Sequence, residues 1–297
     1  MIMKIIVTHS MPDMDAITSA WIIKRFLPGW EDAVIKFVPA GSRYKNKQAK
    51  SDSDFKNAIE TYGEDEVIHV DTGMGPLDHH QTSDDNVCGA TKSLDYVLLQ
   101  DKNQLKDEKL EAVKRIVSVV VEDDHFKEVF RPDPLAYYHD FSIGSILDGL
   151  KLQKPDEDMF YVDYVFQGLD GLLHEFENRI WAEKEIEEKG KKFESHWGNA
   201  FGIETVNDLV IKLGQMMGAA VVVRKDPRKG YVRIKANPKS KADFTNAYEQ
   251  LKKMDPQATW FLHVSKKMLL NGTPKNPTMR PTKLKLDDII AVLKSNK

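Results

Sequence analysis

The 297-residue sequence has one cysteine, Cys88, so no internal disulfide can form. This excludes the disulfide-rich secreted domains and a structural zinc site built from several thiolates. No apolar run approaches the roughly 18 residues that a membrane-spanning helix needs. The apolar start at residues 1–7 is short and lacks the cleavage pattern of a signal peptide. We therefore expect a cytoplasmic protein with no membrane partner.

Several frequent catalytic motifs are also missing. The sequence contains no Gly-x-Ser-x-Gly nucleophile motif, no phosphate-binding P-loop and no glycine-rich dinucleotide fingerprint. What is present is the composition of an ordinary globular protein, with 41% hydrophobic and 30% charged residues. At about 100–200 residues per domain, the length suffices for two domains.

Charge is distributed unevenly along the chain. Residues 224–297 contain 18 Lys and Arg against six Asp and Glu, so this part carries +12. The net charge of −3 leaves −15 for residues 1–223. An acidic first part favours cations and a basic last part favours anions, which suits a metal site that meets a phosphate-bearing ligand. Two solvated surfaces of opposite sign would give the same numbers.

Strands and helices alternate in the first part of the chain. Short β-branched runs predict strands, and apolar residues at helical spacing predict helices. This order favours an α/β domain over residues 1–154, with a mostly parallel sheet flanked by helices. The predicted strands are Lys4–Val7, Val34–Val38 and Glu66–Val70, and the predicted helices are Asp15–Phe26, Asp54–Tyr62, Thr91–Leu99 and Leu105–Val121.

A long charged stretch follows, from Asp156 to about Glu194, with apolar residues every three or four positions. It predicts a helical linker over residues 155–196, followed by a smaller α/β domain over residues 197–297. The predicted strands of that domain are Ile203–Val206, Ala219–Arg224 and Tyr231–Ala236, and its helices are Asp208–Met217, Ala242–Lys253 and Leu286–Lys294.

The first two groups of candidate metal ligands follow predicted strands. His9, Asp13 and Asp15 lie between the first strand and the first helix, and ligands of open α/β sheets bind beyond the carboxyl ends of strands. One imidazole and two carboxylates within seven residues favour a metal site, although Asp15 alone could be the N-cap of the helix. Asp71 ends the third strand, where either a bridging ligand or an ordinary turn residue could stand.

The third group is Asp78-His79-His80. Adjacent side chains of an extended segment point to opposite sides, so one histidine could bind a metal while the other contacts a ligand. Asp78 could accept a hydrogen bond from an imidazole and so fix the orientation of that ring. A polar surface loop is the alternative.

The fourth group is the sequence Glu122-Asp123-Asp124-His125, which follows the apolar run of a predicted helix. Acidic residues are unfavourable at a helix C-terminus, because the helix dipole is negative there. The run is therefore either a solvated helix end or a source of metal ligands.

Taken in order, these four groups resemble the motifs of the DHH phosphoesterase superfamily. That superfamily includes RecJ-type exonucleases, oligoribonucleases, cyclic-dinucleotide phosphodiesterases and family II inorganic pyrophosphatases. The resemblance covers residues 4 to about 130 by motif. The rest of the chain is similar only in outline, as a substrate-binding domain after a helical linker.

The resemblance implies two divalent metal ions, usually manganese, with magnesium or another divalent ion as the alternative. Carboxylates and imidazoles suit such ions on chemical grounds as well. The implied ligands are His9 and Asp13 for one ion, Asp15 and His79 for the other, and Asp71 and Asp124 bridging both. Asp123 is the alternative to Asp124. His80 would contact the substrate phosphate, and Asp78 would support the ligand histidines.

The second domain departs from the family, because the Gly-Gly-His type motif that closes over the substrate is missing. The segment Trp260–Pro277 stands in its place, and a tight turn at Asn271-Gly272 could offer backbone N–H groups to a phosphate. A hairpin with solvated lysines is the alternative. The candidate substrate-binding residues are Arg224, Arg233, His263, Asn271, Gly272, Lys275 and Arg280.

These expectations describe a metal-dependent hydrolase of a phosphodiester or phosphoanhydride bond. The basic second part favours a nucleotide or a short oligonucleotide over pyrophosphate, and the net negative charge disfavours long nucleic acid. A non-catalytic nucleotide-binding module, a pyrophosphatase-like hydrolase and a metal-dependent hydrolase of other substrates are the alternatives. A homodimer is left open.

Overall fold

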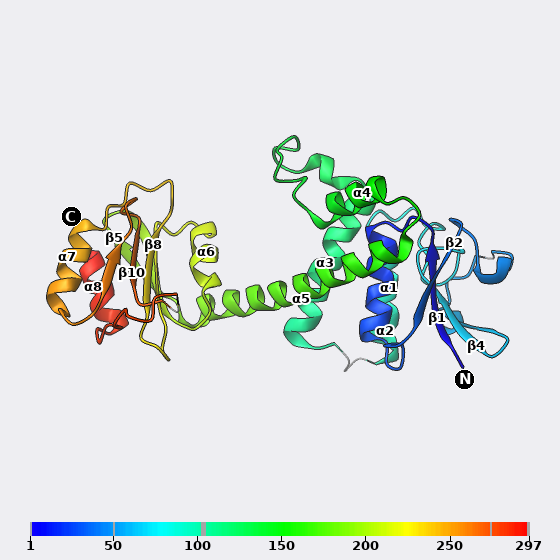
Figure 1. Cartoon of the computed structure of the whole chain (residues 1–297), viewed down its shortest axis with the longest axis horizontal. Coiled ribbons are helices and arrows are strands. Elements are labelled where there is room, and N and C mark those ends of the chain that lie inside the picture. Colours follow the sequence, from blue (N-terminus) through cyan, green and yellow to red (C-terminus); the bar gives the residue numbers. More distant parts are fainter. Residues whose placement is uncertain (1, 50, 102–104, 274, 296–297) are drawn as a thin grey trace. The chain divides into compact units, whose positions relative to one another are not determined.

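The structure is a computed structural model that describes residues 2–49, 51–101, 105–273 and 275–295. It confirms a mixed α/β fold with two compact units, Met1–Glu177 and Asn178–Lys297. The division falls inside one long helix, α5 (Asp158–Lys189), which is shown in green in Figure 1. No helix in the described part of the chain is both long and apolar enough to cross a membrane.

The first unit contains a four-stranded sheet in the order β2-β1-β4-β3. Its central strand β1 (Lys4–His9) pairs in parallel with β2 (Val34–Val38) and β4 (Asp65–His69). The edge strand β3 (Ile59–Tyr62) is antiparallel to β4. The sheet is therefore mostly parallel, as predicted.

The central strand β1 is buried on both faces, because other elements cover the sheet on each side. Helix α1 (Met14–Phe26) packs against both α2 (Gly89–Gln100) and α3 (Asp107–Asp124), and all three lie on one side of the sheet in Figure 1. A small apolar cluster, which includes Tyr62, fills the other side. A further helix, α4 (Ile143–Gln153), precedes α5 and has no counterpart among the predicted elements.

One predicted helix and the end of another are wrong. The segment Asp54–Tyr62 is not a helix, because only the short 3-10 turn Phe55–Asn57 precedes strand β3. The long helix stops at Lys189, and residues up to Glu194 belong instead to strand β5 (Lys191–Ser195). In both segments tertiary pairing at a sheet edge outweighs the local helical pattern.

The second unit contains a six-stranded sheet in the order β5-β6-β7-β8-β10-β9. Only β6 and β7 pair in parallel. The helices α7 and α8 belong to the core on one face, and α6 with the end of α5 belongs to the core on the other. The remaining elements are β6 (Gly198–Glu204), α6 (Leu209–Met216), β7 (Val221–Lys225), β8 (Val232–Ala236), α7 (Thr245–Met254), β9 (Trp260–Leu262), β10 (Met268–Asn271) and α8 (Leu286–Ser295).

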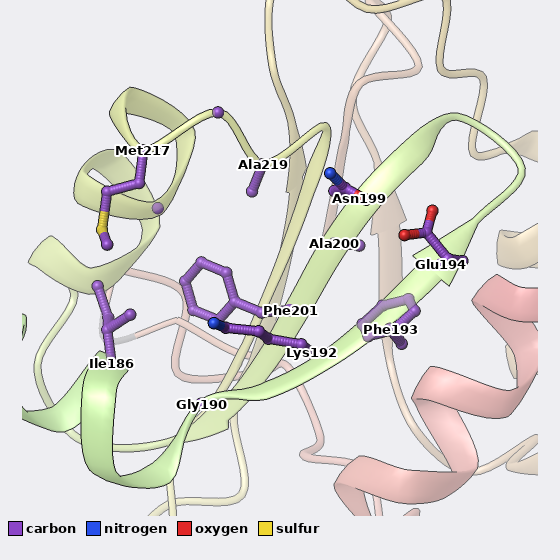
Figure 2. A pocket seen from close by; sticks show the side chains of 12 residues that line it. Ile186, Gly190, Lys192, Phe193, Glu194, Asn199, Ala200, Phe201, Met217 and Ala219 are labelled. Carbon is purple, nitrogen blue, oxygen red and sulfur yellow. The ribbon is translucent and has the colours of Figure 1, made fainter.

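A cavity of about 560 Å³ lies within this second unit. Its lining comes from the last turn of α5, the strands β5 and β6, and the C-terminal end of α6 (Figure 2).

Candidate metal centre

The strand order of the first unit brings His9 and Asp71 to the same edge of the sheet. His9 is the last residue of β1, and Asp71 lies two residues beyond the end of β4, which runs parallel to β1. Asp71 has a φ of +50°, which is uncommon for a residue other than glycine. Its backbone N–H donates to the Leu77 carbonyl oxygen at 3.0 Å. This turn directs the buried carboxylate into the space beyond the strand ends.

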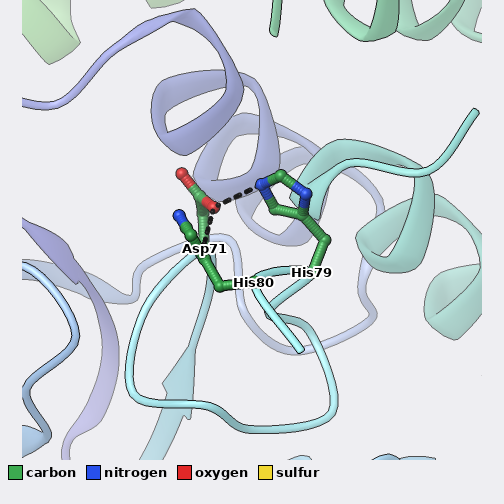
Figure 3. Close-up of side chains that lie close together, drawn as sticks. All are labelled: Asp71, His79 and His80. Atoms are coloured by element: carbon green, nitrogen blue, oxygen red, sulfur yellow. Dashed lines mark ion pairs between the residues drawn. The ribbon is translucent and has the colours of Figure 1, made fainter. Parts of the chain in front are cut away.

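The two carboxylate oxygens of Asp71 face different histidines. Oδ2 lies 3.5 Å from Nε2 of His9. Oδ1 lies 3.4 Å from Nε2 of His79 and 3.7 Å from Nδ1 of His80, and Figure 3 shows these two rings on either side of the carboxylate. A carboxylate with this placement can bridge two ions.

Further acidic side chains surround each of these histidines. Nε2 of His9 lies 3.6 Å from Oδ2 of Asp13. Nε2 of His79 lies 3.7 Å from Oδ2 of Asp15 and 3.6 Å from Oδ2 of Asp124. All six predicted metal ligands therefore meet in one place, and Asp71 lies between the two sets.

The start of α1 separates the roles of its two aspartates. Asp13, not Asp15, is the N-cap, because its carboxylate accepts from the backbone N–H of Ala16 at 2.9 Å. Asp15 is almost fully buried and accepts from the backbone N–H groups of Gly89 and Ala90, both at 2.7 Å. These two donors belong to the first turn of α2, so Asp15 joins α1 to α2 as well as facing His79.

Asp78 supports the second histidine of its motif rather than the first. Its Oδ1 lies 2.6 Å from Nδ1 of His80 and accepts from the His80 backbone N–H at 3.0 Å. Its Oδ2 accepts from the backbone N–H of Met74 at 2.7 Å. The His80 side chain is 58% exposed, so its ring is accessible to a ligand.

The structure also distinguishes the two aspartates at the end of α3. Asp124 faces His79, whereas Asp123 pairs with Arg131 at 2.9 Å. His125 lies beside Asp124, with Nε2 at 3.6 Å from Oδ2 of that residue and at 3.1 Å from the carbonyl oxygen of Val87. The geometry therefore favours Asp124 over Asp123 as a ligand.

The electrostatics of this cluster favour a cation. Burial opposes the charged form of His9, but its contacts with Asp13 and Asp71 outweigh burial and raise the pKa of His9 to about 10. Asp71, followed by the more distant charges of Asp124 and Asp15, raises the pKa of His79 to about 9 against the effect of burial. Burial and the neighbouring charge of Asp71 hold the pKa of Asp15 well above its usual range. So many carboxylates in one buried place repel one another unless a positive charge lies between them.

The donor set fits divalent metal ions. Three overlapping groups each have ligand atoms within 4.8 Å of one another: Asp71, His79 and His80; His79, Asp124 and His125; and His9, Asp13 and Asp71. Bonds of roughly 2.0–2.6 Å to one ion bring its ligand atoms to within about 5 Å of each other. Oδ1 of Asp71 and Oδ2 of Asp124 are also buried without a hydrogen-bond partner in the described part of the chain. Such atoms need a partner, and a cation would supply it.

Sequence reasoning missed two residues that shape this site. A Cβ atom on Gly89 would lie 2.9 Å from Oδ2 of Asp15 and 2.9 Å from Cβ of Asp71, so only glycine fits. Arg43 is buried beneath the turn that carries Asp71. Its side chain packs so closely against Gly73 and Gly75 that a Cβ atom on these residues would lie 2.9 and 2.7 Å from it. Neither residue is a metal ligand by type, so no ligand pattern could indicate it.

Two of the three predicted substrate-binding arginines of the second unit, Arg224 and Arg233, pair with carboxylates. The Arg224 guanidinium is buried and pairs with Asp208 at 3.1 Å and with Asp226 at 3.3 Å. Arg233 pairs with the other carboxylate oxygen of Asp208. A phosphate would have to compete with these carboxylates.

Residues 260–271 of the segment Trp260–Pro277 form the hairpin of β9 and β10, and Asn271 is the last residue of its second strand. The Asn271 side chain is fully buried, donates to the carbonyl oxygens of Thr259 and Arg280, and accepts from the Thr282 N–H, so it holds the fold together. The turn of the hairpin lies at residues 263–267.

The other candidates of this segment have mixed surroundings. His263 bonds to Ser265 within the hairpin turn, and Gly272 packs against Tyr231. Lys275 and Arg280 are exposed. Pro274 lies outside the described residues.

Comparisons with known proteins add little to this picture. No protein-family model and no curated protein sequence matches the chain. One solved structure that is similar by search is described as an uncharacterized protein from Helicobacter pylori G27, with 11% identity over 100% of both chains and a TM-score of 0.25. A similarity of this size supports no argument about fold or function.

Proposed function

We propose that this protein hydrolyses a phosphodiester or phosphoanhydride bond in a nucleotide or a short oligonucleotide, with two divalent metal ions, preferably Mn²⁺, in the first unit. The observation that carries the proposal is Asp71, whose two buried oxygens face His9 on one side and His79 on the other. A single metal site would need one such set of ligands, whereas the chain provides two sets that share this carboxylate.

The position of each candidate ligand in the cluster suggests which ion it would bind. His9 and Asp13 would hold one ion, Asp15, His79 and Asp124 would surround the other, and Asp71 would belong to both. When bound, two such ions supply an activated water and neutralise the charge of the phosphoryl oxygens. No protein nucleophile is then required.

His80 has the placement expected of a residue that contacts the substrate. Its Nδ1 is held by Asp78, so its other ring nitrogen is the one that can contact a phosphate oxygen, to which it donates when the ring is protonated. Asp78 fixes the orientation of that ring and is a positioning residue.

Exposed aromatic side chains that follow the fourth group of candidate ligands in the chain support a substrate with a base. Phe126 directly follows His125 and is 73% exposed, and Phe130 is 84% exposed. Exposed aromatic rings stack on nucleobases of any sequence. Pyrophosphate has no group that such rings would contact.

The test is a turnover assay of the full chain with added Mn²⁺. The substrates are cyclic dinucleotides, di- to pentanucleotides, nucleoside phosphates and pyrophosphate. We expect hydrolysis of at least one base-containing substrate and its loss in the Asp71→Asn variant. Arg115→Gln is the matched control, because Arg115 is not a candidate ligand and pairs with Glu111 at 3.1 Å on α3, and it should keep full activity.

Two results would contradict the proposal. If the chain binds Mn²⁺ and no substrate is hydrolysed, a nucleotide-binding module without catalysis is the better account. If pyrophosphate alone is hydrolysed, the chain is a pyrophosphatase-like hydrolase.

A further inference from the structure

The cavity in the second unit has the features of a small-molecule site. Its volume of about 560 Å³ lies within the range of roughly 300–1,000 Å³ that is usual for such sites. All its lining residues belong to the second unit, whereas the metal-binding candidates belong to the first. Ligand binding in this cavity is therefore independent of the proposed hydrolysis.

The register of two strands explains the floor of this cavity. Lys192 lies opposite Phe201, and Glu194 lies opposite Asn199, in the antiparallel pair of β5 and β6. Residues two apart on a strand share a face, so these four side chains point to the same side of the sheet. Phe193, between them, is buried in the core of the opposite face. Figure 2 shows the Lys192 side chain beside the ring of Phe201.

Three glycines are among the residues that line this cavity. Gly214 on α6 lets the Phe201 ring pack beneath the helix, since a Cβ atom there would lie 2.0 Å from Cε1 of that ring, and Phe201 is accordingly only 7% exposed. Gly190 and Gly218 also line the cavity and present no side chain to it. The apolar wall is completed by Ile186 and by Met217, which is 69% exposed. An exposed, flexible methionine at the mouth of a cavity is suited to cover an apolar ligand.

The polar groups of the cavity define the ligand more narrowly. The Lys192 ammonium can bind an anionic group. About 7 Å along the same strand, by the spacing of alternate residues, the Glu194 carboxylate can accept from N–H groups. The Asn199 amide nitrogen faces Glu194, so its carbonyl oxygen is left as a further acceptor. A matching ligand has an anion at one end, a flat apolar body and an edge of N–H donors at the other.

We propose that this cavity binds a nucleoside monophosphate with a guanine base. The phosphate would meet Lys192, and the base would lie under Met217, against the small part of Phe201 that is exposed. Glu194 would accept from the two adjacent N–H donor groups of the guanine edge. Adenine lacks that pair of donors and would bind more weakly.

The test is calorimetric titration of the full chain in EDTA, so that metal-dependent phosphate binding does not contribute. The probes are guanosine monophosphate, adenosine monophosphate, guanosine and inorganic phosphate. We expect guanosine monophosphate to bind most tightly. Its affinity should fall at least tenfold in Lys192→Ala, and in Glu194→Gln it should fall to the affinity for adenosine monophosphate. Lys212→Ala, an exposed lysine of α6 that does not line the cavity, is the control and should leave binding unchanged.

Three results would overturn the proposal: no binding at millimolar concentration, equal binding of inorganic phosphate alone, or an affinity that Lys192→Ala does not change. Asp71→Asn should bind guanosine monophosphate normally in EDTA. A failure here is thus distinguishable from a failure of the proposed hydrolysis, which is measured with Mn²⁺.

Discussion

At the scale of single residues, the site depends on side chains that face one another from four separate segments. Asp71 has the central place, because each of its oxygens contacts a different histidine. Of the other candidate carboxylates, Asp13 lies beside His9, and Asp15 and Asp124 lie beside His79. Removing an outer ligand and removing Asp71 should therefore have different consequences.

Asp124 and Asp123 provide a matched pair for testing the ligand set. Asp124→Asn should lower the affinity for Mn²⁺ by roughly 100-fold, since loss of even an outer-shell partner costs about 10–100-fold. Asp123→Asn should leave it nearly unchanged, because Asp123 pairs with Arg131 instead. Metal titration with a competing chelator measures both. If Asp123→Asn lowers the affinity for Mn²⁺ more than Asp124→Asn does, Asp123 is the ligand instead.

Glu60 gives a prediction about pH and stability. Burial opposes its charged form, but the hydrogen bond with His69 and the charge of Arg43 outweigh burial and lower the pKa of Glu60 from 4.5 to about 2. A carboxyl whose pKa is depressed by folding stabilises the protein above its unfolded pKa and loses that contribution as the pH falls. The contribution, on the order of 3 kcal/mol at most, should therefore be complete above pH 4.5 and disappear toward pH 2.

Urea unfolding across this range measures the contribution of Glu60. The wild-type protein should lose more stability between pH 5 and pH 3 than Glu60→Gln does. Equal losses in the two proteins would show that the pair with Arg43 does not stabilise the fold.

The candidate ligands could be predicted from the sequence because their residue types are rare in combination and each follows a predictable strand or helix. The supporting residues could not. Gly89 matters only because α2 approaches Asp15 and Asp71, and Arg43 only because a turn lies over it. The need for these two residues arises from contacts between segments that are distant in the sequence. The local sequence pattern contains no information on such contacts.

At the scale of elements, the alternation of strands and helices predicted a mostly parallel first sheet, and the structure confirms it. The failures lie at sheet edges, in β3 and β5, where few apolar residues mark a strand and pairing with a neighbour decides the conformation. Helix α4 was missed because it follows a stretch of loop without periodicity. The packing of α1 against α2 could not be anticipated either, although it buries Asp15.

The junction of α1 and α2 can be tested with glycine substitutions. Gly89→Ala should destabilise the protein by roughly 1–3 kcal/mol through overpacking and should weaken Mn²⁺ binding, because Asp15 and Asp71 must move. Gly149→Ala on α4 is the control. A Cβ atom there meets nothing within 4 Å, so it should stabilise by roughly 0.5–1 kcal/mol. Thermal unfolding and metal titration of both variants measure these effects. An unchanged affinity for Mn²⁺ in Gly89→Ala would show that the packing of α2 against Asp15 and Asp71 does not affect metal binding.

At the scale of the whole molecule, each unit has its own sheet and core, and the candidate ligands belong to the first unit alone. A ligand that binds only the folded form stabilises the part that holds it. Saturating Mn²⁺ should therefore slow amide hydrogen exchange within residues 1–177, most strongly at α1 and at the first turn of α2. Exchange in the sheet of the second unit should stay the same. Protection confined to residues 178–297 would place the metal elsewhere.

The central claim is that two metal ions share Asp71. Its most direct test is elemental analysis of the metal content of the full chain, loaded with Mn²⁺ and freed of excess by gel filtration. We predict two ions per chain in the wild-type protein, neither ion in Asp71→Ala, and both ions in His80→Ala, which should lose rate but not metal. An Asp71→Ala variant that retains two ions per chain would contradict the account.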